Sequence, residues 1–222
     1  MQTCAFSRSP GRVALASAAI SAWRPGVFAV FHALPRNGGC RRLDVRNLTQ
    51  EIHGDPARNG HGGSFRFENV NLTLGRGEWV GLVGKTASGK SSLAARLLRI
   101  YEPPPGTVFL DDADVTGMDV QLLRQRISYV PQEGFLFSQS LHSNFKLGSR
   151  SAPDDEVLRI VDAVQMKDEI DEFPEGLKTR VGERGITLSG GQRQRVALGR
   201  AILRDADFYI LDDPFSAVDL DT

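Results

Sequence analysis

The sequence has few cysteines and no long uncharged stretch. Its two cysteines, Cys4 and Cys40, lie far apart and lack the close spacing of metal ligands. A chain without a disulfide framework is most simply assigned to a reducing, intracellular compartment. The uncharged run Val13–Trp23 ends at Arg24, well short of the roughly 20 apolar residues that a membrane-spanning helix needs. We therefore expect any membrane span to come from another chain or segment.

The chain also has no net charge, because its 27 Lys and Arg balance its 27 Asp and Glu. Proteins that bind nucleic acid usually carry an excess of basic residues, so we expect no nucleic-acid partner. The N-terminal region is more basic than the whole chain, because residues 1–42 contain several arginines and the first acidic residue is Asp44. This composition resembles a transit or signal segment. No clear cleavage site follows Val13–Trp23, which favours a poorly ordered leader or the remnant of an upstream domain.

A glycine-rich stretch, Gly84–Ser92, lies between a predicted strand, Trp79–Val83, and a predicted helix, Ser92–Ile100. It fits G-x-x-x-x-G-K-[ST], the phosphate-binding loop of nucleoside triphosphatases. Such a loop directs backbone N–H groups and a helix N-terminus at one anion. Lys90 would reach the β and γ phosphates of a nucleotide, and Ser91 would bind Mg²⁺. The predicted phosphate-binding residues are Gly84, Lys85, Thr86, Ala87, Ser88, Gly89, Lys90, Ser91 and Ser92.

Strand and helix patterns alternate along the rest of the chain, which predicts an α/β domain with a largely parallel core sheet. Alternating polar and apolar residues predict strands at Leu43–Leu48 and Phe65–Leu74, separated by a polar, glycine-rich loop at 50–63. Further predicted strands are 107–110, 127–130 and 208–211, and a helix is predicted at Asp154–Val164, where acidic residues suit the helix N-terminus.

Two aspartates, Asp212 and Asp213, follow the apolar run 208–211. A carboxylate at the carboxyl end of a buried strand lies where ligands bind in open α/β sheets. Asp212 is therefore predicted to support the Mg²⁺ ion of a nucleotide. The alternative is that both aspartates only cap the turn before Pro214.

A second helix start, Leu188-Ser189-Gly190-Gly191-Gln192, suits a phosphate. Ser189 is a good N-cap, and the glycines leave backbone N–H groups accessible. If this site and the phosphate loop lie on separate faces, one chain cannot fold both around the same nucleotide, which suggests a site shared between two copies. The alternative is an ordinary helix-entry turn.

Together these blocks resemble the nucleotide-binding domain of an ABC transporter, over residues 43–222. The resemblance rests on the phosphate loop, on the LSGGQ signature, and on three further blocks. These are Tyr129-Val130-Pro131-Gln132-Glu133 (similar to the Q-loop), Ile210-Leu211-Asp212-Asp213-Pro214 (Walker B) and Ser216-Ala217-Val218-Asp219 (D-loop). Thr179–Gly185 is similar to the segment that precedes the signature in exporters.

The resemblance implies a P-loop NTPase fold with a RecA-like parallel core, an antiparallel β subdomain and a helical subdomain at about 133–187. It implies an exporter ATPase that binds ATP and Mg²⁺, with Ser91 and Gln132 as metal ligands and Asp212 acting through water. Asp213 and Gln132 would be catalytic, and Ser189, Gly190, Gly191 and Gln192 would contact ATP held by a second nucleotide-binding domain. Phe135-Leu136-Phe137 would face the coupling helix of a transmembrane partner, at the cytoplasmic face of a membrane. Asp219 would lie at the dimer seam.

The sequence departs from the family pattern in four places. Asp213 stands where the family usually has Glu, and Ala87 where it most often has Gly. The region 50–54 lacks the usual adenine-stacking aromatic residue. The strand and histidine that follow the D-loop in the family are not found before Thr222, so we expect an open apolar edge beside Trp79–Val83 and poor solubility.

Three hypotheses follow. The first is the ATPase domain of an ABC exporter. In heterodimeric exporters, Asp in place of Glu commonly marks the slow site, and Asp213 fits that half. The second is a non-catalytic, nucleotide-binding regulatory half or a truncated, inactive fragment. The third, a soluble ABC-type ATPase acting on DNA or ribosomes, is disfavoured because no heptad run separates the phosphate loop from the signature.

Overall fold

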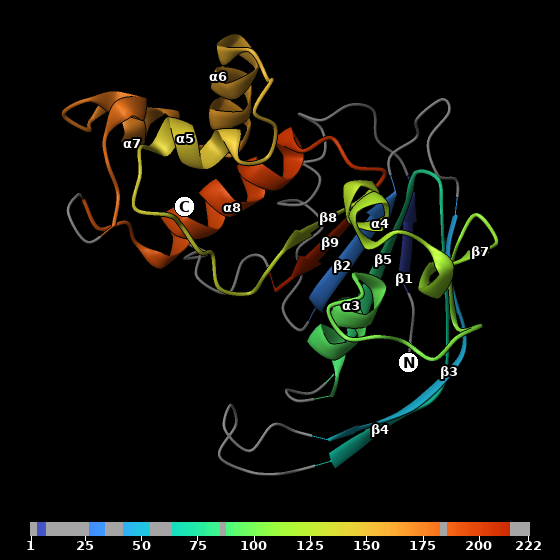
Figure 1. The fold of residues 1–222 in the computed structure, drawn as a ribbon. Coiled ribbons are helices and arrows are strands. Elements are labelled where there is room, and N and C mark those ends of the chain that lie inside the picture. The colour runs from blue at the N-terminus through green and yellow to red at the C-terminus, as the bar shows by residue number, and fades with distance from the viewer. Residues whose placement is uncertain are drawn as a thin grey trace.

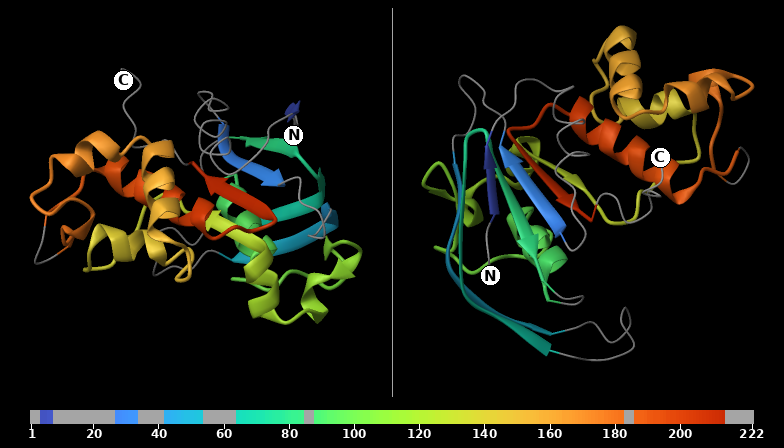
Figure 2. Two further views of the ribbon diagram at one scale, coloured as in Figure 1. Left: turned by 90° about the horizontal axis from the view of Figure 1, so that it is seen from above. Right: turned by 180° about the vertical axis from the view of Figure 1, so that it is seen from behind.

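The computed structural model describes residues 4–7, 27–33, 42–53, 64–84, 88–182 and 186–213. They form two sheets and a group of helices that lies to one side of them (Figure 1). Figure 2 shows the same division from above and from behind, with α5–α8 apart from the strands. We call the part that holds the sheets and α3 the core lobe, and the part that holds α5–α8 the helical lobe.

The first sheet carries the strands that were predicted to flank the nucleotide site. Its order is β1-β5-β2-β9-β8, with β8 parallel to β9, and β2 antiparallel to both β5 and β9. The strands β5, β8 and β9 therefore run in one direction, and their carboxyl ends meet at one edge. Their bounds are β1 Cys4–Ser7, β2 Val27–Ala33, β5 Glu78–Val83, β8 Ile127–Val130 and β9 Phe208–Asp212.

Strand β2 differs from what the sequence predicted. It lies between β5 and β9, with Val27 opposite Val83 and Ala29 opposite Asp212, and β1 pairs with the other side of β5. Both strands come from residues 1–42, where a leader or remnant was expected. The expected open edge beside Trp79–Val83 is therefore wrong, because β5 is paired on both sides. The sheet is also mixed, since only β8 and β9 form a parallel neighbouring pair among the described strands.

The second sheet is antiparallel, in the order β4-β3-β6-β7. Strand β3 continues through His53, whereas a loop was predicted from Gln50, because Gln50–His53 pair in register with β4. The rest of that predicted loop, 54–63, lies outside the described residues. The inward side chains of this sheet, among them Leu43, Val45 and Leu74, are buried. The bounds are β3 Arg42–His53, β4 Ser64–Gly75, β6 Val108–Leu110 and β7 Ala113–Asp114.

Helix α3 packs in the core lobe between the sheets (Figure 1). It spans Lys90–Leu97 and so ends earlier than predicted, because Arg99 has a positive φ of 47°. Leu93 and Leu97 are buried as their spacing predicted, whereas Ile100 is 55% exposed. Short elements η1, Val115–Gly117, and α4, Val120–Arg126, follow β7.

The helical lobe has its own apolar cluster, built around α8, Gly190–Leu203. Gly199 lets α8 approach α5, since a Cβ atom there would lie 2.4 Å from the ring of Phe145. Helix α6 buries Val157, Ile160 and Val161, the apolar face predicted for that segment. The remaining bounds are α5 Leu141–Lys146, α6 Asp154–Ala163, α7 Lys167–Asp171 and η2 Gly176–Lys178.

Candidate functional site

The phosphate loop joins the carboxyl end of β5 to the start of α3. At Gly84, a Cβ atom would lie 2.7 Å from Oγ of Ser88, so the loop closes tightly on itself. Gly89 is the N-cap of α3 with a φ of 90°, a left-handed conformation that glycine adopts without steric cost. These two glycines flank the loop before α3, whose N-terminus would face an anion bound there.

Lys90, the first residue of α3, folds back over this loop. Its Nζ atom donates to the carbonyl oxygen of Gly84 at 2.9 Å and to Oγ of Ser88 at 3.0 Å. Ser91 is exposed and Ser92 is half-buried at the start of the same helix. Lys85, Thr86 and Ala87 lie outside the described residues. The ammonium group therefore lies over the turn in which phosphates would be held.

Asp212 ends β9 with its side chain in the protein interior. The residue is 4% exposed, and its Oδ2 atom accepts a hydrogen bond from the hydroxyl of Tyr129 at 3.1 Å. No basic side chain forms an ion pair with Asp212 in the part of the chain that the structure describes. A buried carboxylate without a cation is costly, so this position suits a metal ion.

Asp213 is half-buried and has a φ of 46°, a region in which Asp occurs more often than most residues. Burial raises the pKa of Asp213, and the negative charge of Asp212 raises it further, whereas the nearby Lys90 lowers it. The two carboxylates and Lys90 thus belong to one electrostatic site, although they come from β9 and α3.

Gln132 follows β8 and is exposed. Its Nε2 atom lies 3.5 Å from Oδ2 of Asp213. The structure therefore brings together three of the predicted strand ends: the phosphate loop after β5, Gln132 after β8, and Asp212 with Asp213 at the end of β9.

The predicted metal-binding residues fit a hard cation such as Mg²⁺. They offer the hydroxyl of Ser91, the amide oxygen of Gln132 and the carboxylate of Asp212, and hard cations prefer oxygen ligands. Within the described residues, the site holds two adjacent carboxylates and one nearby lysine, Lys90, so a divalent cation would offset the excess negative charge.

Sequence reasoning missed two residues of the site, Tyr129 and Gln194. Gln194 lies on α8 and is 2% exposed; its Nε2 atom approaches the carbonyl oxygens of Pro131 at 3.3 Å and Asp213 at 3.5 Å. The available signal was a glutamine on the buried, mainly apolar face of α8, because a buried amide group needs hydrogen-bond partners.

The LSGGQ segment begins α8 with a capping box. Oγ of Ser189 accepts from the backbone N–H of Gln192 at 3.1 Å, and Oε1 of Gln192 accepts from that of Ser189 at 2.8 Å. The predicted N-cap is thereby confirmed. Ser189 is exposed, and α8 belongs to the helical lobe whereas the phosphate loop belongs to the core lobe (Figure 1).

Comparison with known proteins places this arrangement in a family. The sequence profile described as "ABC transporter" matches residues 67–216 of this chain, more than half of its length. The chain belongs to the ABC transporter family. The match includes the phosphate loop, Gln132, the LSGGQ segment and both aspartates, and the α/β fold is that of the ABC ATPase domain, a P-loop NTPase.

Several known proteins are similar to the chain. Heavy metal tolerance factor 1 of Caenorhabditis elegans is 38% identical over 86% of this chain and 23% of its own length. The mitochondrial iron-sulfur clusters transporter ATM1 of Gibberella zeae is 35% identical over 79% of this chain and 27% of its own length. A bacterial Atm1-family ABC exporter solved with ATP bound aligns with a TM-score of 0.69 at 26% identity, covering 85% of this chain and 32% of that chain.

This ABC transporter domain thus spans about a quarter of the length of the curated relatives it matches. Among the described residues, no helix has both the length and the apolar character needed to cross a bilayer. Besides residues 85–87 of the phosphate loop, further predicted parts of the family pattern lie outside the described residues: Pro214 of the Walker B block, the D-loop at 216–219 with Asp219, and residues 183–185 of the segment before the signature.

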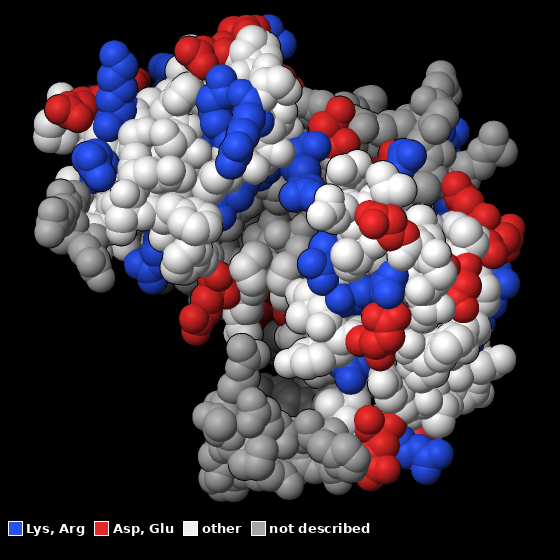
Figure 3. Space-filling model, in the orientation of Figure 1, with Lys and Arg blue, Asp and Glu red and all other residues white. Residues whose placement is uncertain are grey.

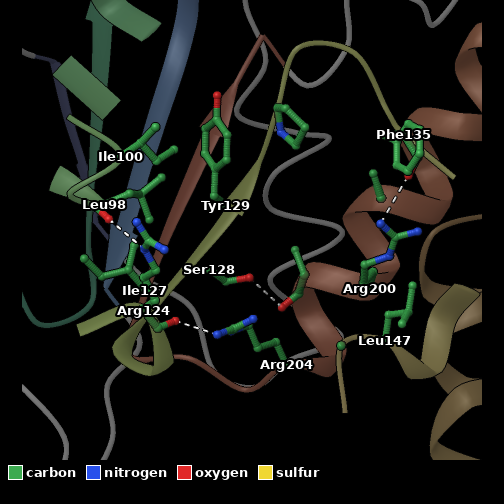
Figure 4. A pocket seen from close by; sticks show the side chains of 14 residues that line it. Leu98, Ile100, Arg124, Ile127, Ser128, Tyr129, Phe135, Leu147, Arg200 and Arg204 are labelled. Carbon is green, nitrogen blue, oxygen red and sulfur yellow. Dashed lines mark hydrogen bonds between the residues drawn. The ribbon is translucent and has the colours of Figure 1, made fainter. Parts of the chain in front are cut away.

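A groove of about 540 Å³ separates the two lobes of the ABC transporter domain. Figure 4 shows its lining, which comes from the core lobe on one side and from α8 and its neighbours on the other. We call it the interlobe groove and define it by Leu98, Ile100, Arg124, Ile127, Ser128, Tyr129, Pro131, Phe135, Leu147, Gly148, Ala197, Arg200, Ala201 and Arg204.

Three arginines line the interlobe groove, and they donate hydrogen bonds to carbonyl or amide oxygens. Arg124 donates to the carbonyl oxygens of Leu98 and Arg99, and Arg204 donates to that of Arg124. Arg200 donates to Phe135 and Asn144, and burial lowers its pKa. None pairs with a carboxylate of the described chain, so the groove is positively charged. Figure 3 shows basic side chains on both lobes where they face each other.

Aromatic side chains extend the groove at the helical lobe. Phe135 and Phe137 are 63% and 50% exposed and pack edge to face, with ring centroids 5.0 Å apart. Leu136 instead packs against the apolar cluster of the helical lobe. Of the three residues predicted to face a partner, the structure thus exposes the two phenylalanines and turns Leu136 inward.

Proposed function

We propose that this chain is the ATP-binding and ATP-hydrolysing part of an ABC exporter, with Mg²⁺ as the metal. The observation that carries the proposal is the meeting of the phosphate loop, Gln132 and the Asp212–Asp213 pair at one edge of the sheet. The similarity to exporters over most of the chain supports it.

The phosphate loop would hold the nucleotide through backbone N–H groups and Lys90. Lys90 already places its ammonium over Gly84 and Ser88, and from this loop it would bind the β and γ phosphates. Ser91 and Gln132 would bind Mg²⁺ directly, and Asp212 would hold water of the metal shell. The bound ion would neutralise the charge that develops on the phosphates during transfer.

Asp213 would orient the attacking water, with the amide of Gln132 beside it. A raised pKa suits a proton acceptor. However, aspartate is one methylene shorter than the usual glutamate, and a small misplacement of such a group can cost about a hundredfold in rate. We therefore propose that hydrolysis at this site is slow. The same observation favours a second candidate, a nucleotide-binding half that regulates its partner without hydrolysing ATP.

The signature would act on a second nucleotide-binding domain. Ser189 is exposed at the start of α8, in a different lobe from the phosphate loop of the same chain. Gly190 and Gly191 have no side chains that would keep a phosphate from the backbone. We propose that Ser189, Gly190, Gly191 and Gln192 complete the ATP site of a partner domain, whether identical or different.

The interlobe groove would receive a cytoplasmic segment of a membrane-spanning partner. Its exposed phenylalanines and unneutralised arginines suit a segment with both apolar and acidic side chains. Through this contact the chain would lie at the cytoplasmic face of a membrane.

The two candidate functions are separated by phosphate release from the chain assembled with its membrane-spanning partner. An ATPase predicts slow release by the wild type, which Asp213→Asn abolishes while ATP binding remains. Asp162→Asn serves as a control on the exposed face of α6. If wild type and Asp213→Asn bind ATP and release phosphate at the same background rate, the regulatory function is the correct one.

A further inference from the structure

Tyr129 connects the interlobe groove with the predicted metal site. It lies on β8, and its ring forms part of the groove wall beside Ile100 and Ile127 (Figure 4). Its hydroxyl, at the end of the ring, donates a hydrogen bond to Oδ2 of Asp212 at 3.1 Å. Asp212 lies 83 positions after Tyr129 in the chain. One side chain thus contacts both the groove and the carboxylate that would hold the metal shell.

Within the described residues, the Asp212 carboxylate accepts a hydrogen bond from the hydroxyl of Tyr129. Asp212 is 4% exposed, so bulk water does not stabilise its charge. A carboxylate has two oxygens with about four acceptor positions. The hydroxyl occupies one of them and fixes the rotation of the carboxylate, while the remaining positions stay available to a metal-bound water.

The register of the sheet makes this contact rigid. Strands β8 and β9 are parallel, with Tyr129 opposite Ile210 and Val130 opposite Leu211. Ser128, the neighbour of Tyr129, is buried and donates from Oγ to the carbonyl oxygen of Ala201 at 3.1 Å, which ties β8 to α8. Burial raises the pKa of Tyr129 and the charge of Asp212 raises it further, so the phenol remains a neutral donor.

We propose that Tyr129 is a positioning residue for the metal site: its hydroxyl holds the Asp212 carboxylate in the orientation that receives Mg²⁺ with the nucleotide. This proposal rests on the proposed function of the site. Because the ring lines the interlobe groove, it also gives an occupant of the groove direct contact with the residue that orients Asp212.

The test measures how ATP binding by the whole chain depends on Mg²⁺. A fluorescent ATP analogue is titrated at a series of Mg²⁺ concentrations and, separately, in excess EDTA. Tyr129→Phe removes the hydroxyl and keeps the ring in the groove wall. Tyr101→Phe makes the same chemical change at a residue that is 51% exposed.

We expect Tyr129→Phe to raise the half-saturating Mg²⁺ concentration about fivefold, the effect of losing one hydrogen bond of ordinary net strength. Its affinity for the analogue in EDTA should equal that of the wild type, and Tyr101→Phe should change neither value. In an Asp212→Asn background, adding Tyr129→Phe should have no further effect on the Mg²⁺ dependence, because the hydroxyl then has no carboxylate to orient.

The inference would be overturned if Tyr129→Phe kept the Mg²⁺ dependence of the wild type while Asp212→Asn clearly weakened Mg²⁺-dependent binding. The proposed function would then still stand. An equal loss of affinity with Mg²⁺ and with EDTA would also overturn it, because it would show a general structural role. If the wild type binds the analogue without any dependence on Mg²⁺, the proposed metal site itself fails.

Discussion

The side-chain amide of Gln132 lies against the carboxylate of Asp213, with 3.5 Å between Nε2 and Oδ2. The contact links the end of β8 with the end of β9 beside the phosphate loop. In the proposed site these are the two groups that handle the attacking water.

Replacing Asp213 with glutamate should accelerate hydrolysis. The longer side chain brings its oxygens closer to the water, and the gain can approach about a hundredfold if misplacement is the limiting factor. Steady-state ATP turnover of Asp213→Glu is measured in the assembled transporter, with the site of the partner domain inactivated. Nucleotide affinity should change little, since Lys90 and Asp212 are untouched. Equal turnover of the Asp and Glu forms would show that this chain is an ordinary catalytic half.

Asp213 should also make stability depend on pH in a defined direction. Its pKa is raised in the folded state from 3.8, so the charged carboxylate disfavours folding and the protonated form does not. Asp213→Asn should therefore melt at a higher temperature than the wild type at neutral pH, without Mg²⁺ or nucleotide. The difference should shrink as the pH falls through the raised pKa and vanish below 3.8.

Thermal melts of the two proteins across pH 3 to 8 check this expectation, with Asp162→Asn on the exposed face of α6 as the matched control. A wild type that is more stable than Asp213→Asn at neutral pH would contradict this expectation. It would show that the attraction of Lys90 for the Asp213 carboxylate exceeds the combined cost of burial and of repulsion by Asp212.

Two substitutions at Ser189 should separate the capping role from the phosphate-binding role. Ser189→Ala breaks the capping box and should cost about 1 kcal/mol of stability. Ser189→Asp keeps a good N-cap but places a negative charge where a partner's nucleotide would bind. It should retain the thermal stability of the wild type and lose ATP-dependent association of two domains, measured by light scattering. If the Ser189→Asp variant associated normally, the signature would not be part of the shared ATP site.

The first 41 residues should be needed for a well-behaved domain, because β2 fills the space between β5 and β9. A protein that begins at Arg42 leaves both edges of β5 and one edge of β9 unpaired and should aggregate in size-exclusion chromatography. The 222-residue chain should elute as one species. Val30→Pro, which removes an N–H from the middle of β2, should resemble the deletion. A stable, monodisperse protein without residues 1–41 would show that β2 is dispensable.

The sequence predicted the elements whose signals are local. Apolar runs located β5, β8 and β9 to within a residue, and Ser189 located the start of α8, because burial and capping depend on neighbouring residues. Long-range pairing was not predictable. The mainly apolar run Val27–Ala33 is a local signal for a strand, but nothing in it specifies an antiparallel insertion between β5 and β9. Strand β3 extends through His53 because β4 pairs with it.

The same division applies to the site. Lys90, Gln132 and Asp212 were predicted from motifs, each from the strand or turn that precedes it. The hydroxyl of Tyr129 and the amide of Gln194 were not, because their partners lie 83 and 19 positions away and depend on sheet register and helix docking.

Binding of Mg²⁺-ATP by Lys90→Ala tests the central claim most directly. Lys90 places its ammonium over Gly84 and Ser88, and losing its charged hydrogen bonds to the phosphates should weaken binding at least about a hundredfold. The matched control is Lys146→Ala, on α5 in the helical lobe. Circular dichroism establishes that both variants are folded. The account predicts a fluorescent-nucleotide titration without saturation for Lys90→Ala and with normal saturation for Lys146→Ala; wild-type affinity in a folded Lys90→Ala protein would contradict it.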